Sequence, residues 1–160
     1  MIKPGCTVTK DHLKDFLASI QAMRKTQCYV GIPAEKTPRK GEPINNAALG
    51  YIFEFGSAAA NIPARAVLVP GVKSVQKDTI ADLRHGAINL FRDPSALERS
   101  FNRCGLRAST AVKKAIVALG DYGPDSKTLQ ARQRRGFKGA GIERVTGQFL
   151  NSFTYVIRGK

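Results

Sequence analysis

Residues 93–120 read DPSALERSFNRCGLRASTAVKKAIVALG, and the fold predicted for the chain depends chiefly on them. Its apolar residues recur every three or four positions, which is the period of one face of an α-helix. They are Leu97, Phe101, Cys104, Ala108, Val112, Ala115 and Leu119. Asp93 is expected to cap the helix, Pro94 to occupy its first turn and Gly120 to end it. We therefore predict a long helix over residues 94–119 with a continuous apolar seam.

The seam needs a partner, and the preceding segment supplies one. Residues 71–92 have a broad apolar side at helical spacing, which predicts a second long helix. Its apolar residues are Val72, Val75, Ile80, Leu83, Ala87, Leu90 and Phe91. Gly86 lies inside this helix and is expected to weaken it.

Two shorter helices are predicted before this pair. The first has apolar residues at i, i+3, i+4 and i+7, with Thr9 or Asp11 as its cap. These apolar residues are Leu13, Phe16, Leu17 and Ile20. The second is expected to begin at Asn45 or Asn46 and to end near Gly56.

Three segments are expected to form a small sheet. Residues 27–32 and 153–157 are rich in residues that favour strands. Residues 66–69 lie in a stretch kept extended by Pro63 and Pro70, because proline disfavours a helical conformation in the residue before it. We therefore predict an α+β fold in one domain over residues 1–160, with two long packed helices against a small antiparallel or mixed sheet.

Charge is the unusual feature of the composition. The 160 residues include 26 Lys and Arg against 12 Asp and Glu, which gives a net charge of +14. This excess predicts a polyanionic partner, either nucleic acid, an anionic membrane or an acidic protein surface. Residues 95–160 hold 13 of the basic residues and only four of the acidic ones, so the partner is expected at the C-terminal part.

Two segments lack the apolar residues needed to offset the entropy of ordering, and both are predicted to be mobile loops. They are residues 34–44 and the basic residues 121–141. In the second, the candidate contacts to DNA or to an acidic neighbour are Lys127, Arg132, Arg134, Arg135 and Lys138. Phosphate contacts of this kind would be independent of base sequence. The alternative is a solvated surface without a partner.

Nothing in the chain predicts catalysis, a metal site or a cofactor. Cys6, Cys28 and Cys104 lack zinc-ligand spacing, and the two histidines, His12 and His85, lie among charged neighbours. No signal peptide or apolar run long enough to span a bilayer is present, and the odd cysteine count favours a reducing cytoplasm. We expect a protein that is made in a cytoplasm, is not an enzyme, has no small-molecule substrate and does not enter a membrane.

Four segments carry a resemblance to a known family. Residues 48–56 read ALGYIFEFG and residues 61–68 read NIPARAVL, while residues 126–132 read SKTLQAR and residues 145–153 read VTGQFLNSF. Together they resemble the morphogenesis and tail-completion proteins of long-tailed bacteriophages. Ala66 and Val67 stand where that family usually has Pro-Phe. Of the apolar residues Tyr51, Phe53, Phe55 and Val67, at least two are expected in the core.

The resemblance implies a structural virion protein, made in the host bacterium, that completes the tail or neck and helps to join head to tail. It implies a ring, six copies being the expected number, without catalytic residues. The implied partners are copies of the chain itself, connector, tail terminator or tail tube proteins, and genomic DNA in the channel. Glu54, Phe55 and Arg65 are the candidate interface residues, with packing inside the subunit as the alternative.

A sequence-nonspecific nucleic-acid-binding protein is the alternative function. It rests on the net charge alone, because the chain has no helix-turn-helix, zinc or RNA-recognition signature. Strongly salt-dependent DNA binding by the monomer would favour it, whereas ring assembly with little affinity for DNA would favour the virion protein.

Overall fold

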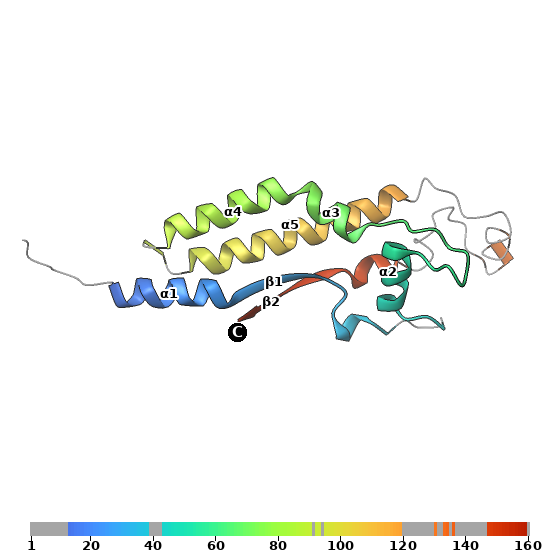
Figure 1. Ribbon diagram of the computed structural model, residues 1–160, viewed down its shortest axis with the longest axis horizontal. Coiled ribbons are helices and arrows are strands. Elements are labelled where there is room, and N and C mark those ends of the chain that lie inside the picture. The colour runs from blue at the N-terminus through green and yellow to red at the C-terminus, as the bar shows by residue number, and fades with distance from the viewer. Residues whose placement is uncertain are drawn as a thin grey trace, which may run out of the picture.

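The computed structural model is an elongated α+β structure in which helix α5 lies along the longest axis (Figure 1). It describes residues 13–38, 43–90, 92–93, 95–119, 130, 133–134, 136 and 147–159. Helices α3 (Leu68–Ser74) and α4 (Gln76–Asn89) pack along one side of α5 (Ala96–Ala118), and a two-stranded ribbon preceded by helix α1 (Leu13–Lys25) lies along another. The predicted fold class is confirmed, including the two long packed helices.

Helix α5 covers Ala96–Ala118, and its apolar seam is buried from Leu97 to Val112, whereas Ala115 and Leu119 are only partly buried. The predicted start is wrong by two residues, because Ser95 and not Asp93 is the N-cap. Asp93 instead accepts hydrogen bonds from the Ser95 backbone N–H (2.9 Å) and hydroxyl (2.7 Å), and it pairs with Arg99. The bond from Arg99, followed by those from Ser95, lowers the pKa of Asp93 to about 2. Pro94 and Gly120 lie outside the described residues.

The helix predicted over residues 71–92 is two helices, α3 (Leu68–Ser74) and α4 (Gln76–Asn89). They meet at Val75, which has non-helical dihedral angles (φ −110°, ψ 11°). The extended conformation expected around Pro70 is also wrong. This proline falls in the first turn of α3, where its missing N–H costs no intrahelical hydrogen bond.

The sheet has two strands, β1 (Thr26–Gly31) and β2 (Thr154–Gly159), paired antiparallel from Thr26↔Gly159 to Gly31↔Thr154. The strand predicted over residues 66–69 is wrong, because Leu68 and Val69 belong to α3. One face of the ribbon packs on α5, where the Tyr155 hydroxyl donates to Asn102 Oδ1 at 3.1 Å.

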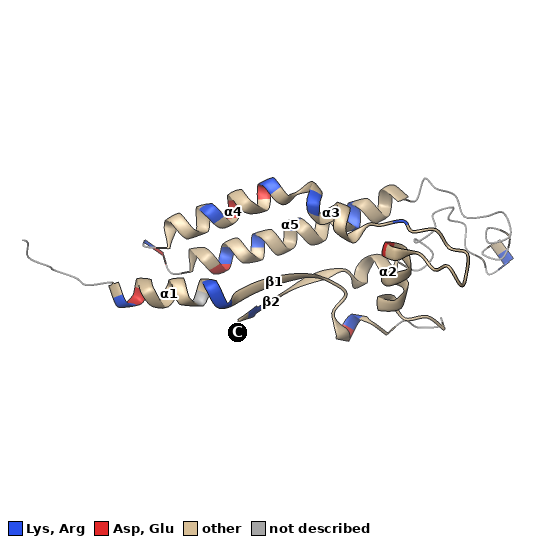
Figure 2. Cartoon of the chain, viewed as in Figure 1, with Lys and Arg blue, Asp and Glu red and all other residues tan. Residues whose placement is uncertain are grey.

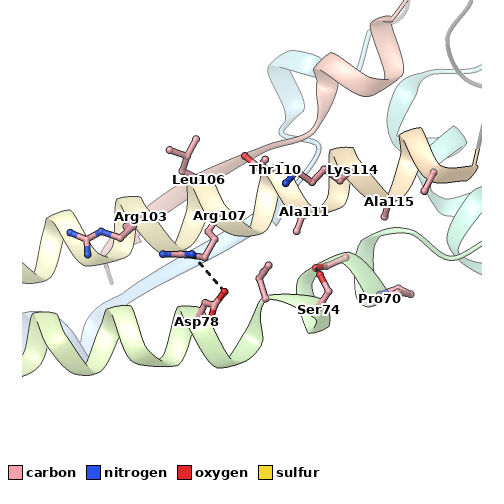
Figure 3. Close-up of a pocket in the computed structure, with 13 residues that line it drawn as sticks. Pro70, Ser74, Asp78, Arg103, Leu106, Arg107, Thr110, Ala111, Lys114 and Ala115 are labelled. Carbon is pink, nitrogen blue, oxygen red and sulfur yellow. Dashed lines mark hydrogen bonds and ion pairs between the residues drawn. The ribbon is translucent and has the colours of Figure 1, made fainter.

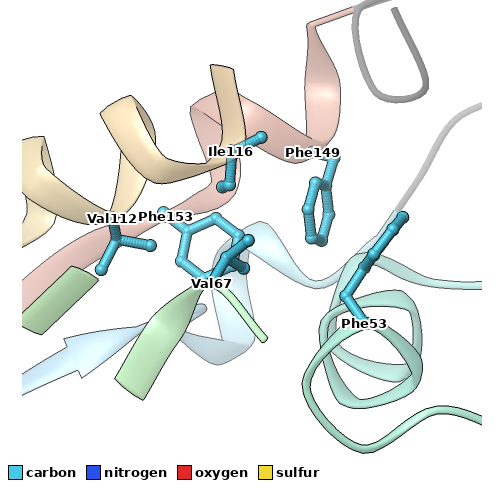
Figure 4. Close-up of a cluster of buried hydrophobic side chains, with 6 residues drawn as sticks. All are labelled: Phe53, Val67, Val112, Ile116, Phe149 and Phe153. Carbon is cyan, nitrogen blue, oxygen red and sulfur yellow. The ribbon is translucent and has the colours of Figure 1, made fainter. Parts of the chain in front are cut away.

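Two apolar clusters hold these elements together. The first joins α2 (Asn46–Phe55), α5 and α7 (Gln148–Ser152), with the rings of Phe149 and Phe153 edge to face at 5.1 Å (Figure 4). Its buried members are Phe53, Val67, Val112, Ile116, Phe149 and Phe153. The second comprises Leu90, Leu97 and Phe101, and it receives α1 (Leu13–Lys25) through partly buried apolar side chains.

Two asparagines at the start of α2 have different roles. Asn45 is the cap, because its side chain accepts a hydrogen bond from the Ala48 N–H at 2.7 Å. Asn46 is buried, and its amide donates to the Lys36 carbonyl at 3.0 Å, which ties the 3₁₀ helix Ala34–Lys36 to α2. The expected mobility of residues 34–44 stays a prediction, as residues 39–42 lie outside the described part of the chain.

Gly86, expected to weaken its helix, is required where α4 approaches α5. A Cβ atom at this position would lie 2.2 Å from Ser100 Oγ and 3.2 Å from the Ala96 carbonyl oxygen. Replacing Gly86 with alanine is therefore expected to destabilise the protein by about 1–2 kcal/mol, although alanine favours helices. Urea unfolding measures this change.

The matched control is Gly50→Ala in α2, where the nearest contact is the flexible end of Ile32 at 3.3 Å. That substitution is expected to be neutral. The cost of Gly86→Ala is expected to shrink in a Ser100→Gly background, since the clashing hydroxyl is gone. An equal cost in both backgrounds would contradict the close approach at this position.

Candidate interaction surfaces

Glu54 connects the two N-terminal segments of the family resemblance. Its carboxylate accepts hydrogen bonds from the backbone N–H groups of Val67 (2.9 Å), Leu68 (2.9 Å) and Val69 (3.0 Å). These groups lie at the N-terminal end of α3, where a negative charge satisfies free donors and interacts favourably with the helix dipole. Glu54 therefore has a role inside the subunit, and its contact with a neighbouring copy stays a prediction.

The turn between these segments is tightly closed. Gly56 ends α2 at φ 77°, and Ser57 and Ile62 form a single antiparallel bridge. A Cβ atom on Gly56 would lie 2.8 Å from the Ile62 carbonyl oxygen. The Arg65 N–H donates to the Phe53 carbonyl at 2.7 Å, so Arg65 is anchored through its backbone. The turn thereby fixes the position of α2 relative to α3.

An aromatic pair projects from the solvent side of α2. Tyr51 is 64% exposed and Phe55 68% exposed, with ring centroids 4.8 Å apart. Phe53 and Val67 are buried, which confirms that at least two of the four apolar residues belong to the core. Ile62, in the turn that follows α2, is also exposed, and we define the α2 surface as Tyr51, Phe55 and Ile62.

A second apolar surface lies on α1. Phe16 and Met23 pack against the second cluster, whereas Leu13 is 61% exposed, Leu17 50% and Ile20 37%. These three residues define the α1 surface. It lies at the opposite end of the molecule from α2 (Figure 1). Sequence periodicity predicted this apolar stripe but could not show that only one side of it would be covered.

A groove of about 770 Å³ runs between α5 and the α3–α4 pair (Figure 3). Arg103, Arg107 and Lys114 of α5 are among the residues that line it. Both arginines are already paired with the buried carboxylate of Asp82, at 3.3 Å and 3.0 Å, and Arg107 also lies 3.6 Å from Asp78. These ion pairs neutralise much of the charge in the groove, so it is a helix–helix junction with little capacity left for an anionic ligand.

The basic loop predicted over residues 121–141 is largely outside the described residues. Arg134 is described and exposed. Lys127, Arg132, Arg135 and Lys138 are not described, and their contact with DNA or an acidic neighbour stays a prediction.

The described residues include two cysteines and one histidine. Burial raises the pKa of the Cys28 thiol and, together with nearby Asp82, that of Cys104, which makes both poor nucleophiles at neutral pH. His85 lies on the exposed side of α4 beside Asn89. Within the described ranges no three His, Cys, Asp or Glu residues are grouped as metal ligands, and no helix is long and apolar enough to cross a membrane.

Comparison of the chain with models of protein families, with curated proteins and with solved structures found no match.

Proposed function

We propose that the protein is a structural component of a tailed-phage virion, which completes the tail or neck and helps to join head to tail as part of a ring. The resemblance to tail-completion proteins motivates this proposal. Glu54 supports it, because its bonds to Val67, Leu68 and Val69 give a physical reason for the spacing of two of the resembling segments.

The observation that carries the proposal is the presence of two unlike apolar surfaces at opposite ends of one elongated subunit. Exposed apolar patches of this kind mark protein–protein contacts. When the α1 surface of one copy contacts the α2 surface of the next, the assembly still exposes one α1 surface and one α2 surface. Further copies can therefore add head to tail until a ring closes. Six copies remain the number implied by the resemblance.

The expected neighbours follow from the same proposal. Connector, tail terminator or tail tube proteins would adjoin the ring above and below, and genomic DNA would pass through its channel. The net charge of +14 suits a ring around DNA, because the charges need only track phosphates without fixed docking. A sequence-nonspecific nucleic-acid-binding protein explains this charge equally well but gives no role to the two apolar surfaces.

Two single variants test the head-to-tail contact. Phe55→Ser removes the centre of the α2 surface and Leu17→Ser that of the α1 surface, and each is expected to abolish self-association while leaving the fold intact, because both side chains are exposed. Native mass spectrometry of the full chain at increasing concentration measures the assembly. Leu106→Ser, which removes an equally exposed side chain from α5, is the control and is expected to assemble as wild type.

A mixture of the two variants tests directly whether the α1 surface of one copy contacts the α2 surface of another. Each variant retains the surface that the other lacks, so the mixture is expected to form heterodimers of one copy each and nothing larger. Assembly of either variant alone would contradict the head-to-tail contact. DNA binding by a persistently monomeric wild type would favour the alternative function.

A further inference from the structure

The solvent face of α4 carries a regular row of cations and isoleucines. Lys77, Ile80, Arg84 and Ile88 follow one another at three- and four-residue spacing, which places them on one face of the helix. All four are exposed, whereas Gly86 on the opposite face touches α5. Lys73 at the end of α3 and Arg92 after α4 are also exposed and extend the row. We call this set the α4 stripe: Lys73, Lys77, Ile80, Arg84, Ile88 and Arg92.

Within the described part of the chain, no ion pair compensates the charge of the α4 stripe. Between residues 68 and 92 the only acidic residues are Asp78 and Asp82, and both pair with arginines of α5. Among the described residues no carboxylate lies within ion-pair distance of a cation of the stripe. The blue segments along α3 and α4 in Figure 2 mark these cations. This surface therefore differs from the groove beside it, where the arginines are neutralised.

The two isoleucines of the α4 stripe distinguish between a nucleic acid, a lipid surface and an acidic protein as its partner. Ile80 is 57% exposed and Ile88 65% exposed, and each lies next to a cation of the row. A nucleic-acid backbone would pair with the cations but would offer no apolar surface to the isoleucines. A lipid surface requires a wide apolar face, whereas α4 presents two isolated side chains. An acidic protein surface with apolar side chains between its carboxylates satisfies both kinds of residue.

We infer that the α4 stripe is a docking surface for another protein, whose matching surface alternates carboxylates with apolar side chains. Within α4 the stripe runs from Lys77 to Ile88, a rise of about 17 Å or roughly three helical turns, and Lys73 and Arg92 lie beyond the two ends of this helix. Its cations accelerate encounter with the acidic partner, and its isoleucines become buried in the contact. The partner's place as an adjoining component of the phage neck rests on the proposed function, but the docking chemistry does not.

A synthetic peptide can serve as the probe. It is an amphipathic helix in which Glu and Leu alternate at four-residue spacing along one face. The full-length protein is expected to bind it, and Lys77→Glu/Arg84→Glu is expected to weaken binding by at least about tenfold. Ile80→Ser/Ile88→Ser is expected to weaken it as well. The control, Lys25→Glu/Lys36→Glu, makes the same change of net charge on exposed side chains elsewhere and is expected to bind as wild type. Fluorescence anisotropy at two salt concentrations measures these affinities.

Several results would overturn the inference. A peptide with Gln in place of Glu that binds equally well would remove the role of charge. Equal loss of binding in the control would mean that only net charge matters. Binding of a 30-base-pair duplex or of anionic phosphatidylglycerol vesicles that depends on Lys77 and Arg84 but not on Ile80 and Ile88 would replace the protein partner with a phosphate surface.

Self-association of the same variant distinguishes docking of another protein from the contact between copies in a ring. Lys77→Glu/Arg84→Glu leaves the α1 and α2 surfaces unchanged, so the variant is expected to self-associate as wild type. Loss of self-association in this variant would place the α4 stripe in the contact between copies and would overturn its assignment to another protein.

Discussion

Phe101→Asp is expected to remove the cooperative unfolding transition at ordinary temperatures. Phe101 is buried in the second apolar cluster with Leu90 and Leu97, so a carboxylate placed there would lie among apolar side chains. Burial of an unpaired charge together with loss of an aromatic ring costs about 4 kcal/mol or more, a large share of the stability of a small domain. Thermal unfolding followed by circular dichroism measures the effect.

The control for this prediction is Phe101→Leu, which keeps an apolar side chain and is expected to cost only about 1 kcal/mol. Helix α1 should respond most strongly to changes in the cluster, because Phe16 and Met23 attach it there. Hydrogen exchange is therefore expected to accelerate first in Leu13–Lys25. A wild-type melting temperature for Phe101→Asp would contradict the burial of the seam.

Glu54→Ala is expected to have the second largest effect. The substitution leaves three backbone N–H groups without their acceptor, and Val67, which holds one of them, is only 2% exposed. Loss of charge-assisted bonds at a helix N-terminus is expected to cost about 2–3 kcal/mol. Urea unfolding measures the free energy. The isosteric Glu54→Gln keeps an oxygen acceptor but loses the charge, so it is expected to show about half of this loss.

The matched control for Glu54 is Glu35→Ala, which removes an exposed carboxylate from the 3₁₀ helix Ala34–Lys36. It is expected to leave the unfolding midpoint unchanged, as surface substitutions of this kind do. Equal midpoints for Glu54→Ala and the wild type would show that the carboxylate does not hold α3 in place.

Local pattern was sufficient to predict some elements and insufficient for others. The periodicity of α5, the β-prone residues of both strands and a cap at Asn45 or Asn46 are local signals. The structure confirms all three, with Asn45 as the cap. The segment at residues 66–69 was predicted wrongly because its conformation depends on Glu54, which lies more than ten residues earlier. A bond between distant residues leaves no periodic signal in the segment that it shapes.

The candidate surfaces were predictable in part. On α2 the spacing of four residues between Leu49 and Phe53, and between Tyr51 and Phe55, puts the two pairs on opposite faces. The helix can bury only one of them, so one pair had to be exposed, although the pattern does not say which. The α4 stripe was not predicted from the sequence, because the single helix expected over residues 71–92 placed Ile80 on its buried side. The break at Val75 gives α4 its own orientation, and Ile80 points to solvent.

We propose that copies of this chain form a ring in the neck or tail of a phage particle. Electron cryomicroscopy of purified particles that contain the chain can show whether such a ring is present. The density is expected to contain a closed ring of copies around the DNA channel between head and tail, with α1 of each copy against α2 of the next. A single copy, or the absence of any ring of this chain from the particle, would contradict the claim.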